Sequence, residues 1–191
     1  GPLTRAAQAS VLEAQDRDAV KKGAKLLCGG RRVKGTPNLF PPTVLGGANN
    51  RMKLMWDESF GPIIGVQKVK DDEEAIRLAN QTAYGLGASL WTKDLSRAER
   101  LIPQIEAGSV FVNGAVHSDP RLPFGGVKRS GLGRELGREG PGDAVSVSAV
   151  APTMNPTPAS VGSDPAVNVG GGAIGVELAP PVASSIAGRV I

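Results

Sequence analysis

Between residues 63 and 113, segments with the two-residue period of a β-strand alternate with segments that have the period of an α-helix. The predicted strands are residues 63–69, 86–91 and 109–113. Asp71 and Asp94 are in N-cap positions before the two predicted helices, and Glu74 is placed to complete a capping box with Asp71. The order strand, helix, strand, helix, strand predicts an open α/β sheet with crossover connections.

The N-terminal part of the chain adds a further helix and two extended segments. Thr4 is the predicted cap of a helix that runs to about Lys22. Residues 24–28 are predicted to be a short strand. Residues 39–45 are predicted to be extended, because they contain two consecutive prolines, which cannot lie inside a helix.

The C-terminal part of the chain has a different composition. Residues 143–150 alternate apolar and polar residues as an edge strand would. Residues 151–191 contain six prolines, six glycines and no aromatic residue. Their small amount of bulky apolar surface cannot offset the entropy lost on ordering, so this tail is predicted to be largely disordered.

Charge and cysteine content exclude several classes of protein. The net charge of +4 includes a basic cluster in a glycine-rich segment, but no aromatic residues alternate with it, so no nucleic-acid partner is expected. The cluster consists of Lys128, Arg129, Arg134 and Arg138. Cys28 is the only cysteine, which excludes an intrachain disulfide and a cysteine-based zinc site. No apolar run reaches the roughly 20 residues that span a bilayer. We therefore expect a cytoplasmic location and no membrane partner.

Three segments, in this order, form a set of motifs that is typical of one enzyme family. They are Glu58-Ser59-Phe60-Gly61-Pro62, Tyr84-Gly85-Leu86-Gly87-Ala88-Ser89 and Pro123-Phe124-Gly125-Gly126-Val127-Lys128-Arg129-Ser130-Gly131-Leu132-Gly133-Arg134-Glu135. Through them, residues 1–140 resemble the C-terminal portion of the aldehyde dehydrogenase catalytic domain, which has an open α/β sheet. The resemblance implies that residues 141–150 are a remnant of an oligomerisation strand, and it does not extend to residues 151–191, the tail rich in proline and glycine.

The resemblance also implies an activity, the oxidation of an aldehyde to a carboxylic acid with NAD or NADP. In this chemistry a cysteine thiolate attacks the carbonyl, hydride passes to the cofactor, and an activated water hydrolyses the thioester. Glu58 matches the family's glutamate that accepts hydrogen bonds from the nicotinamide ribose, and Phe60 matches the aromatic residue that packs near the nicotinamide. The alternative is that both residues only finish a helix and fill the core.

Residues 112–126 are similar to bacterial succinate-semialdehyde dehydrogenases, which implies succinate semialdehyde as the aldehyde substrate. Ser118 or Arg121 can supply the polar donor that the acid end of this aldehyde needs. Arg121 can equally be a solvated charge at the rim. Phe124 either lines the aldehyde tunnel or fills the core.

No catalytic residue is assigned within these 191 residues. In the family, the nucleophile, the glutamate that activates water and the main dinucleotide-binding fold lie N-terminal to a region like residue 1, so the chain is expected to be an inactive fragment. Cys28 lacks the nucleophile's motif and is interpreted as a buried packing residue. His117 has no second histidine with which to share a metal ion and is interpreted as a loop residue near the pocket. Ser130 and Arg134 are expected to be structural.

Beyond Glu135 the chain departs from the family pattern, because Pro141 interrupts it and residues 151–191 have no counterpart. Residues 170–179 resemble a dinucleotide-binding motif, but two prolines follow where its helix should continue, which indicates a chance match or a truncated remnant. The parent enzyme is expected to be a homo-oligomer. The alternative function is a non-catalytic remnant or fusion product that at most pairs with a partner chain.

Overall fold

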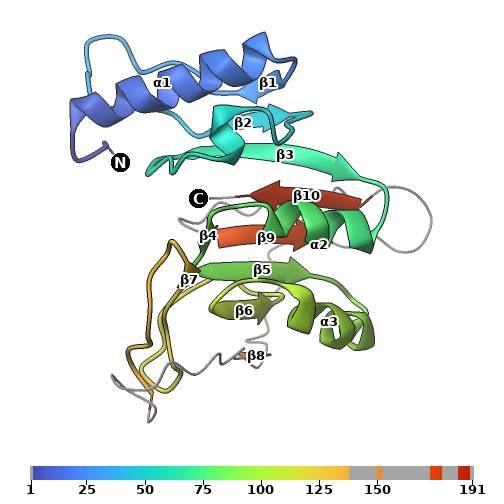
Figure 1. The fold of residues 1–191 in the computed structure, drawn as a ribbon. Helices are drawn as coiled ribbons and strands as arrows, with labels where there is room; N and C mark the ends of the chain where they lie inside the picture. Colours follow the sequence, from blue (N-terminus) through green and yellow to red (C-terminus); the bar gives the residue numbers. More distant parts are fainter. Residues whose placement is uncertain (1, 138–149, 152–172, 178–184, 190–191) are drawn as a thin grey trace.

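A mixed sheet runs through the molecule and carries helices on its surface (Figure 1). The computed structural model describes residues 2–137, 150–151, 173–177 and 185–189. In their hydrogen-bonded order, the strands of this sheet are β1 (Lys25–Cys28), β2 (Thr43–Gly46), β3 (Ile63–Val69), β10 (Ser185–Arg189), β9 (Ala173–Glu177), β5 (Gly87–Trp91), β6 (Ser109–Val112) and β8 (Val150–Ala151). Two short strands, β4 (Tyr84–Gly85) and β7 (Val127–Lys128), pair separately.

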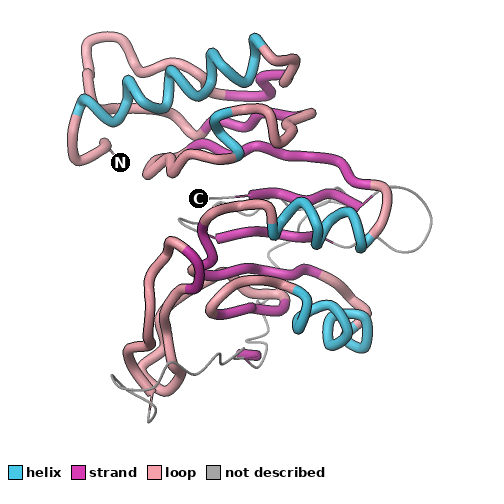
Figure 2. The backbone as a smooth tube through the Cα atoms, in the orientation of Figure 1, coloured by secondary structure: helices cyan, strands magenta, loops and turns pink. Residues whose placement is uncertain are grey.

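The helical elements follow the strands as the hydrophobic pattern predicts. They are α1 (Ala6–Lys21), α2 (Asp72–Asn80) and α3 (Leu95–Leu101), with 3-10 turns η1 (Lys53–Met55) and η2 (Ile102–Gln104). The chain passes from β3 through α2 to β5, and from β5 through α3 to the parallel strand β6. Figure 2 shows α2 and α3 on the same face of the sheet. The predicted open α/β sheet with crossover connections is therefore confirmed.

Aspartate caps begin both crossover helices. The Asp71 carboxylate accepts a hydrogen bond from the Glu74 amide at 2.8 Å, and the Asp94 carboxylate accepts one from the Arg97 amide at 2.9 Å. The capping box differs from the prediction in one bond. The Glu74 side chain accepts from the Lys70 amide at 2.9 Å, one residue before the expected donor. A local pattern was sufficient to locate these two helix starts.

Two helix ends differ from the sequence prediction. Thr4 is not the cap of α1, because the extended backbone that precedes the helix is at Arg5, which makes no side-chain cap bond. The helical spacing of apolar residues from Leu95 to Ile105 predicts a helix that ends at Gly108, but α3 ends at Leu101. Pro103 lies in the 3-10 turn that follows, and a proline cannot donate the backbone hydrogen bond that would continue an α-helix.

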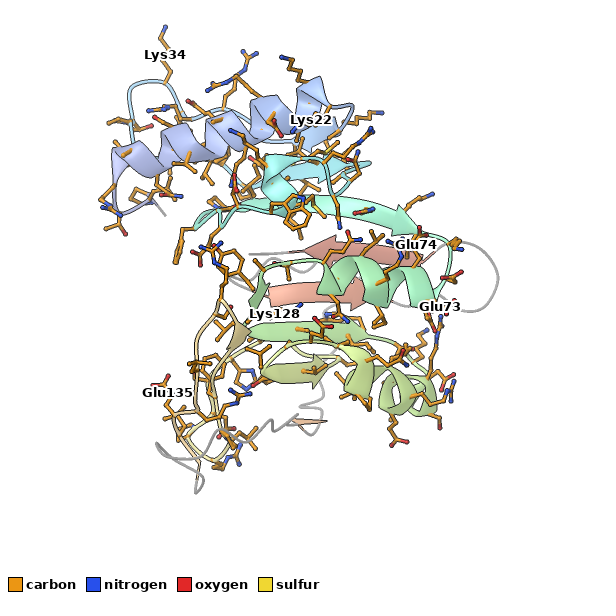
Figure 3. All side chains as sticks on the ribbon, in the orientation of Figure 1. Lys22, Lys34, Glu73, Glu74, Lys128 and Glu135 are labelled. Atoms are coloured by element: carbon orange, nitrogen blue, oxygen red, sulfur yellow. The ribbon has the colours of Figure 1, made fainter. Side chains whose placement is uncertain are left out.

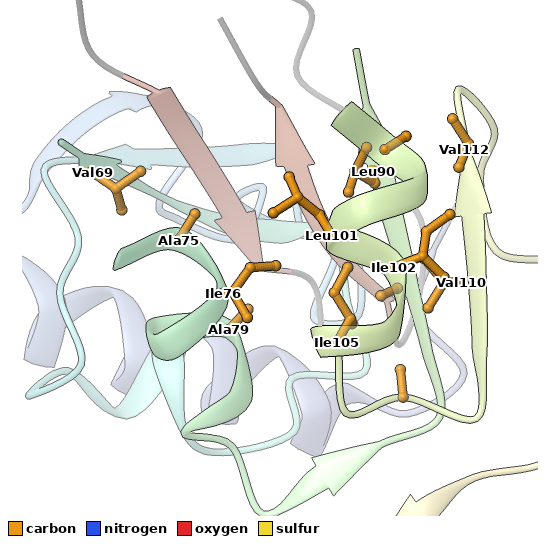
Figure 4. Packing of buried hydrophobic residues seen from close by; sticks show 13 residues of the cluster. Val69, Ala75, Ile76, Ala79, Leu90, Leu101, Ile102, Ile105, Val110 and Val112 are labelled. Carbon is orange, nitrogen blue, oxygen red and sulfur yellow. The ribbon is translucent and has the colours of Figure 1, made fainter. Parts of the chain in front are cut away.

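The buried apolar side chains form two separate clusters. One lies between α2, α3, β5 and β6, and Figure 4 shows it from close by. Its larger members are Val69, Ile76, Leu90, Leu101, Ile102, Ile105, Val110 and Val112. The other lies between α1, η1, β2 and the start of β3, and its larger members are Leu12, Phe40, Leu45, Met52, Leu54, Met55 and Ile63. The first cluster thus extends from Val69 on β3 to Val110 and Val112 on β6, and the second packs β2 and the start of β3 against α1.

The middle of the sheet contains two strands from the C-terminal tail. β10 pairs antiparallel with β3 and with β9, and β9 pairs parallel with β5. The sequence pattern predicts no strands at these positions, so β9 and β10 are an addition to the predicted fold. Strand β9 also takes the residues that a dinucleotide-binding motif would place in a helix. Pairing with the open edges of β3 and β5 supplies backbone hydrogen bonds that composition alone does not reveal.

The predicted edge strand at residues 143–150 is described only at its end, where β8 lies beside β6 at the edge of the sheet. Residues 143–149 lie outside the described residues, and so does most of the tail. Within the described part, no helix is both long and apolar enough to cross a membrane.

Candidate functional site

The loop between η1 and β3 presents an acidic and an aromatic side chain to solvent. Ser59 is buried with 2% exposure, whereas Glu58 and Phe60 on either side of it are exposed. Phe60 is 72% exposed, and its φ of 42° is in the left-handed region that residues other than glycine seldom adopt. The alternative in which Phe60 fills the core is therefore wrong for the described structure. The loop exposes the Phe60 ring to solvent.

This loop is anchored to one face of α1. The side-chain amide of Gln8 donates to the Ser59 carbonyl, and that of Gln15 donates to the Asp57 carbonyl in a long bond of 3.5 Å. Both backbone neighbours of Glu58 are thus held by the helix. Because residues seven apart lie on the same helix face, the spacing of these glutamines is the sequence signal that could have identified them, although no role was assigned to either.

Gly61 allows the loop to lie directly against α1. A Cβ atom at Gly61 would lie 2.4 Å from Cδ1 of Leu12, which is fully buried on the same helix face. A larger residue at position 61 would therefore require either the Leu12 side chain or the loop to move. The Glu-Ser-Phe-Gly-Pro motif consequently combines two exposed side chains with two positions that fit against α1.

The second candidate region is the loop that follows β6, and its charged residues form a local ion pair. Nε and Nη2 of Arg121 donate to the two oxygens of Asp119 at 2.9 and 2.6 Å, and the Arg121 amide also donates to Asp119 at 2.9 Å. These bonds hold the pKa of Asp119 well below its usual range and raise the pKa of Arg121. Ser118 is exposed beside this pair. The Arg121 side chain is 84% exposed.

Phe124 is half-buried and is fixed by its backbone. Its amide donates to the Glu135 carbonyl at 2.7 Å, and the Glu135 amide donates back at 2.8 Å. This antiparallel bridge closes the glycine-rich segment between the two residues. The position of Phe124 is compatible with either of its predicted roles, lining a tunnel or packing.

The glycine-rich motif is held by Ser130, Arg134 and close backbone contacts. Ser130 Oγ accepts from the Gly85 amide at 3.0 Å, and Arg134 Nη1 donates to two carbonyls of the motif at 2.9 and 2.8 Å. A Cβ atom at Gly108 would lie 1.7 Å from the Gly125 carbonyl oxygen, so no larger residue fits there without moving the backbone. Both polar side chains therefore have the structural role that the sequence predicts.

Cys28 lies outside the two candidate regions, whereas His117 lies in the loop that follows β6. Cys28 is exposed on the edge strand β1, with Sγ 3.6 Å from the Pro42 carbonyl oxygen. The expectation that Cys28 is a buried packing residue is therefore wrong, because all four residues of β1, Cys28 among them, are exposed. His117 Nδ1 lies 2.9 Å from the Ala115 carbonyl, and its ring contacts the ring of Phe111 with centroids 5.0 Å apart. Within the described ranges, no three His, Cys, Asp or Glu side chains converge on a possible metal site.

The two candidate regions lie on the side of the sheet where β3 and β5 begin (Figure 1). Glu135 is on this side as well, whereas Glu73 and Glu74 are on the opposite side, at the start of α2 (Figure 3). No hydrogen bond or ion pair within the described ranges joins Glu58 or Phe60 to the loop after β6. The regions thus share a side of the molecule without direct polar contact.

Comparison with known proteins identifies the class to which this fold belongs. The sequence model of the aldehyde dehydrogenase family matches residues 1–150. Succinate-semialdehyde dehydrogenase (NADP+) 1 from Mycobacterium ulcerans is 44% identical over 140 residues, which are 73% of this chain and 31% of that protein. The crystal structure of succinate-semialdehyde dehydrogenase from Burkholderia pseudomallei matches with a TM-score of 0.70 at 41% identity, over 73% of this chain and 29% of that one. The Mycobacterium tuberculosis aldehyde dehydrogenase complexed with NAD+ matches with a TM-score of 0.68 at 38% identity, over 73% and 29% of the two chains.

The α/β sheet, the anchored Glu-Ser-Phe loop and the glycine-rich motif are thus parts of one family framework. The chain belongs to the aldehyde dehydrogenase family. It spans about a third of the length of the relatives that it matches, with 31% of the Mycobacterium ulcerans protein covered. The family match ends at residue 150, so β9 and β10 lie outside it.

Proposed function

We propose that this chain contributes to an NAD- or NADP-dependent aldehyde dehydrogenase and that Glu58 and Phe60 contact the nicotinamide end of the cofactor. The observation that carries the proposal is the alternation at residues 58–60, where two exposed functional side chains flank a buried serine. Phe60 belongs to neither of the two apolar clusters in the described part of the chain. A ring kept outward on an unfavourable backbone conformation is typical of a binding residue.

The residues of this loop fit a nicotinamide nucleotide chemically. An ionised carboxylate has two acceptor oxygens, which suits the paired hydroxyls of a ribose. An aromatic ring beside it offers a flat apolar surface to a heteroaromatic ring. The cofactor, when bound, accepts the hydride. The task of Glu58 and Phe60 is to orient it, and the glutamines of α1 keep both at fixed positions.

We further propose that succinate semialdehyde is the aldehyde and that the loop after β6 binds it through Ser118, Arg121 and Phe124. The support is the similarity to two succinate-semialdehyde dehydrogenases over the residues that include this loop. The bond between Arg121 and Asp119 adds a condition. Nε and Nη2 of Arg121 already donate hydrogen bonds to Asp119. A substrate carboxylate must therefore bind Nη1 of Arg121 or displace Asp119.

The cofactor role is tested by replacing the matching segment of a full-length succinate-semialdehyde dehydrogenase with residues 1–137 and then introducing Glu58→Gln. The amide keeps the size of the side chain but loses the charge that strengthens its hydrogen bonds. We expect the KM for NAD or NADP to rise about ten-fold, or kcat to fall, with an unchanged melting temperature.

The matched control is Glu73→Gln, which changes an exposed glutamate on the opposite side of the molecule (Figure 3). Its steady-state constants should equal those of the unmodified chimera. Equal constants for Glu58→Gln as well would refute the cofactor role. The substrate role is tested in the same chimera with Arg121→Gln, which should raise the KM for succinate semialdehyde more than the KM for an uncharged aliphatic aldehyde.

A further inference from the structure

Residues 119–122 (Asp-Pro-Arg-Leu) form a tight turn in the loop that follows β6. The Leu122 amide donates to the Asp119 carbonyl at 3.0 Å, which makes Asp119 the first residue of the turn and Pro120 the second. Both residue types suit these positions, because the proline ring presets φ and the aspartate side chain accepts from the amide two residues further on. Here the Arg121 amide donates to Asp119 Oδ1 at 2.9 Å. The turn therefore brings the Asp119 carboxylate and Arg121 together.

The Asp119 carboxylate is the fixed member of this pair, and Arg121 is the side chain that it holds. The side chain of Asp119 is 15% exposed, whereas that of Arg121 is 84% exposed. The turn is tied to the end of the glycine-rich segment, because the Gly137 amide donates to the Pro120 carbonyl at 3.2 Å. Displacing Asp119 would leave a mostly buried carboxylate without its charged partner, which is costly. A substrate carboxylate is therefore expected to bind beside Asp119 and not in its place.

The bonds to Asp119 fix the orientation of the whole guanidinium. Nε and Nη2 of Arg121 donate to the two carboxylate oxygens at 2.9 and 2.6 Å. A guanidinium is planar and rigid, so two bonds along one edge fix its plane and the direction of the remaining donors. No residue in the described part of the chain accepts a hydrogen bond from Nη1 of Arg121. Nη1 is thus left for a substrate carboxylate, and it points in one direction.

The position of Nη1 is also fixed relative to Phe124. Prolines precede and follow Arg121 in the segment that leads to Phe124, and a proline ring restricts φ. The second of them, Pro123, is buried. Phe124 exchanges two backbone hydrogen bonds with Glu135, at 2.7 and 2.8 Å. A carboxylate bound at Nη1 would therefore lie at a set distance from the part of the site that Phe124 forms.

We propose that Asp119 is a positioning residue that sets the length of the aldehyde: by holding Arg121 in one place, it favours succinate semialdehyde over a homologue with an additional methylene group. The inference rests on the proposed role of Arg121 as the donor to the substrate carboxylate. A fixed donor binds the carboxylate at one distance from the reacting carbonyl, whereas a mobile arginine can follow the end of a longer chain. Asp119 therefore acts on the selectivity between aldehydes of the same charge and needs no contact with the substrate.

The orientation of Arg121 is tested first, in the full 191-residue chain without substrate. Heteronuclear NMR measures how fast the Nε hydrogen of Arg121 exchanges with water, and Arg121→Gln identifies its signal. The comparison is Asp119→Asn, which keeps the size of the side chain but removes the charge that strengthens both bonds. We expect exchange at least about ten-fold faster in the variant. Equal rates would overturn the proposal, because Asp119 would then not hold Arg121.

Selectivity is tested in the chimera that carries residues 1–137. The quantity measured is the ratio of kcat/KM for succinate semialdehyde to kcat/KM for glutarate semialdehyde. Both substrates carry one carboxylate, so the charge that Asp119→Asn removes changes their attraction to Arg121 to the same extent and cancels in the ratio. We expect the ratio to fall at least about three-fold, because the longer substrate gains relative to the shorter one. The ratio for butanal over pentanal, which have no carboxylate, should stay the same and also shows that the variant is folded.

Glu73→Gln is the matched control, because it removes an exposed charge on the opposite side of the molecule and should change neither ratio (Figure 3). An unchanged semialdehyde ratio in Asp119→Asn would refute the positioning role. An equal fall in the ratio for the uncharged aldehydes would refute it as well, because the loop would then act through packing alone. Arg121→Gln separates this inference from the proposed substrate role. If it raises the KM for succinate semialdehyde while Asp119→Asn leaves the semialdehyde ratio unchanged, only the positioning role fails; if it leaves that KM unchanged, the substrate role fails too.

Discussion

At the scale of single residues, the alternation of exposed and buried side chains at Glu58, Ser59 and Phe60 decides what the loop can do. Ser59 is buried and its carbonyl is held by Gln8 of α1, whereas Glu58 and Phe60 on either side of it are exposed. The sequence motif identified all three residues. It could not reveal the anchors Gln8 and Gln15, because their contact with the loop depends on how α1 packs.

The Asp119–Arg121 pair shows a similar limit. Two residues apart in a loop, these side chains meet only because of a turn that no periodic pattern encodes. The sequence therefore left open whether Arg121 is a substrate donor or a solvated charge. The structure adds that its guanidinium already has a carboxylate partner, so its availability to a substrate depends on Asp119.

A buried carboxylate on α1 leads to a prediction about pH. Asp16 is 8% exposed, and its Oδ1 has no hydrogen-bond partner, so burial raises the pKa of Asp16. A folded-state pKa above the unfolded one favours folding below the ordinary aspartate pKa of about 3.9, and this contribution is lost as the pH rises through the folded pKa. We expect Asp16→Asn to raise the melting temperature at pH 7 by about 2–4 °C, with no gain near pH 3.

Asp18 on the same helix is the control with the opposite sign. It bonds to the Lys22 side chain at 3.0 Å and to the Lys53 amide at 2.8 Å, which lowers the pKa of Asp18. Its contribution is present above the ordinary aspartate pKa and is lost as the pH falls. Asp18→Asn should therefore lower the melting temperature at pH 7. Scans at several pH values that gave both variants the same sign would contradict the assignment.

At the scale of elements, the starts of α2 and α3 were predictable, whereas the start of α1 and the end of α3 were not. An aspartate cap acts on an amide three residues away, so Asp71 and Asp94 could be located from the sequence alone. The early end of α3 depends on Pro103, which has a known local effect but lay within a run of apolar residues at helical spacing. The sequence prediction gave more weight to the helical spacing of the apolar residues than to Pro103.

The contact between the Glu-Ser-Phe loop and α1 gives a prediction for the loop as an element. Gly61→Ala places a methyl group 2.4 Å from Cδ1 of Leu12 and should cost about 1–3 kcal/mol of unfolding free energy. Shortening Leu12 to alanine costs about 2–5 kcal/mol by itself but makes room for the added methyl group. The double variant should therefore be more stable than the sum of the two effects predicts.

Urea denaturation of the two single variants and the double variant measures this coupling. Gly114→Ala is the control, because a Cβ atom there meets only a carbonyl oxygen at 3.9 Å. It should stay within about 0.5 kcal/mol of the parent chain. Additive effects at Gly61 and Leu12 would mean that the loop does not rest on α1 as described.

At the scale of the whole molecule, the sheet combines what the sequence predicted with what it could not. Each strand from β1 to β6 that belongs to this sheet overlaps a segment that the sequence predicts to be a strand or extended, so the α/β class followed from local information. The insertion of β9 and β10 did not follow, because pairing with β3 and β5 joins segments more than eighty residues apart. Composition indicates that the tail can form little apolar core of its own. It does not indicate that the tail can pair with the edges of β3 and β5.

The last prediction concerns activity: the 191-residue chain by itself should not oxidise aldehydes. Covalent aldehyde oxidation requires a thiolate next to both the carbonyl and the nicotinamide. Cys28 is the only thiol of these residues, and it is exposed at the end of β1, an edge strand that β2 separates from β3. The assay is NADH or NADPH formation from succinate semialdehyde, with Cys28→Ser in parallel and the chimera that carries residues 1–137 as the positive control. We expect no reduced cofactor from either form of the chain and clear turnover from the chimera. Turnover by the chain that Cys28→Ser abolishes would make Cys28 the nucleophile and would require a different placement of β1.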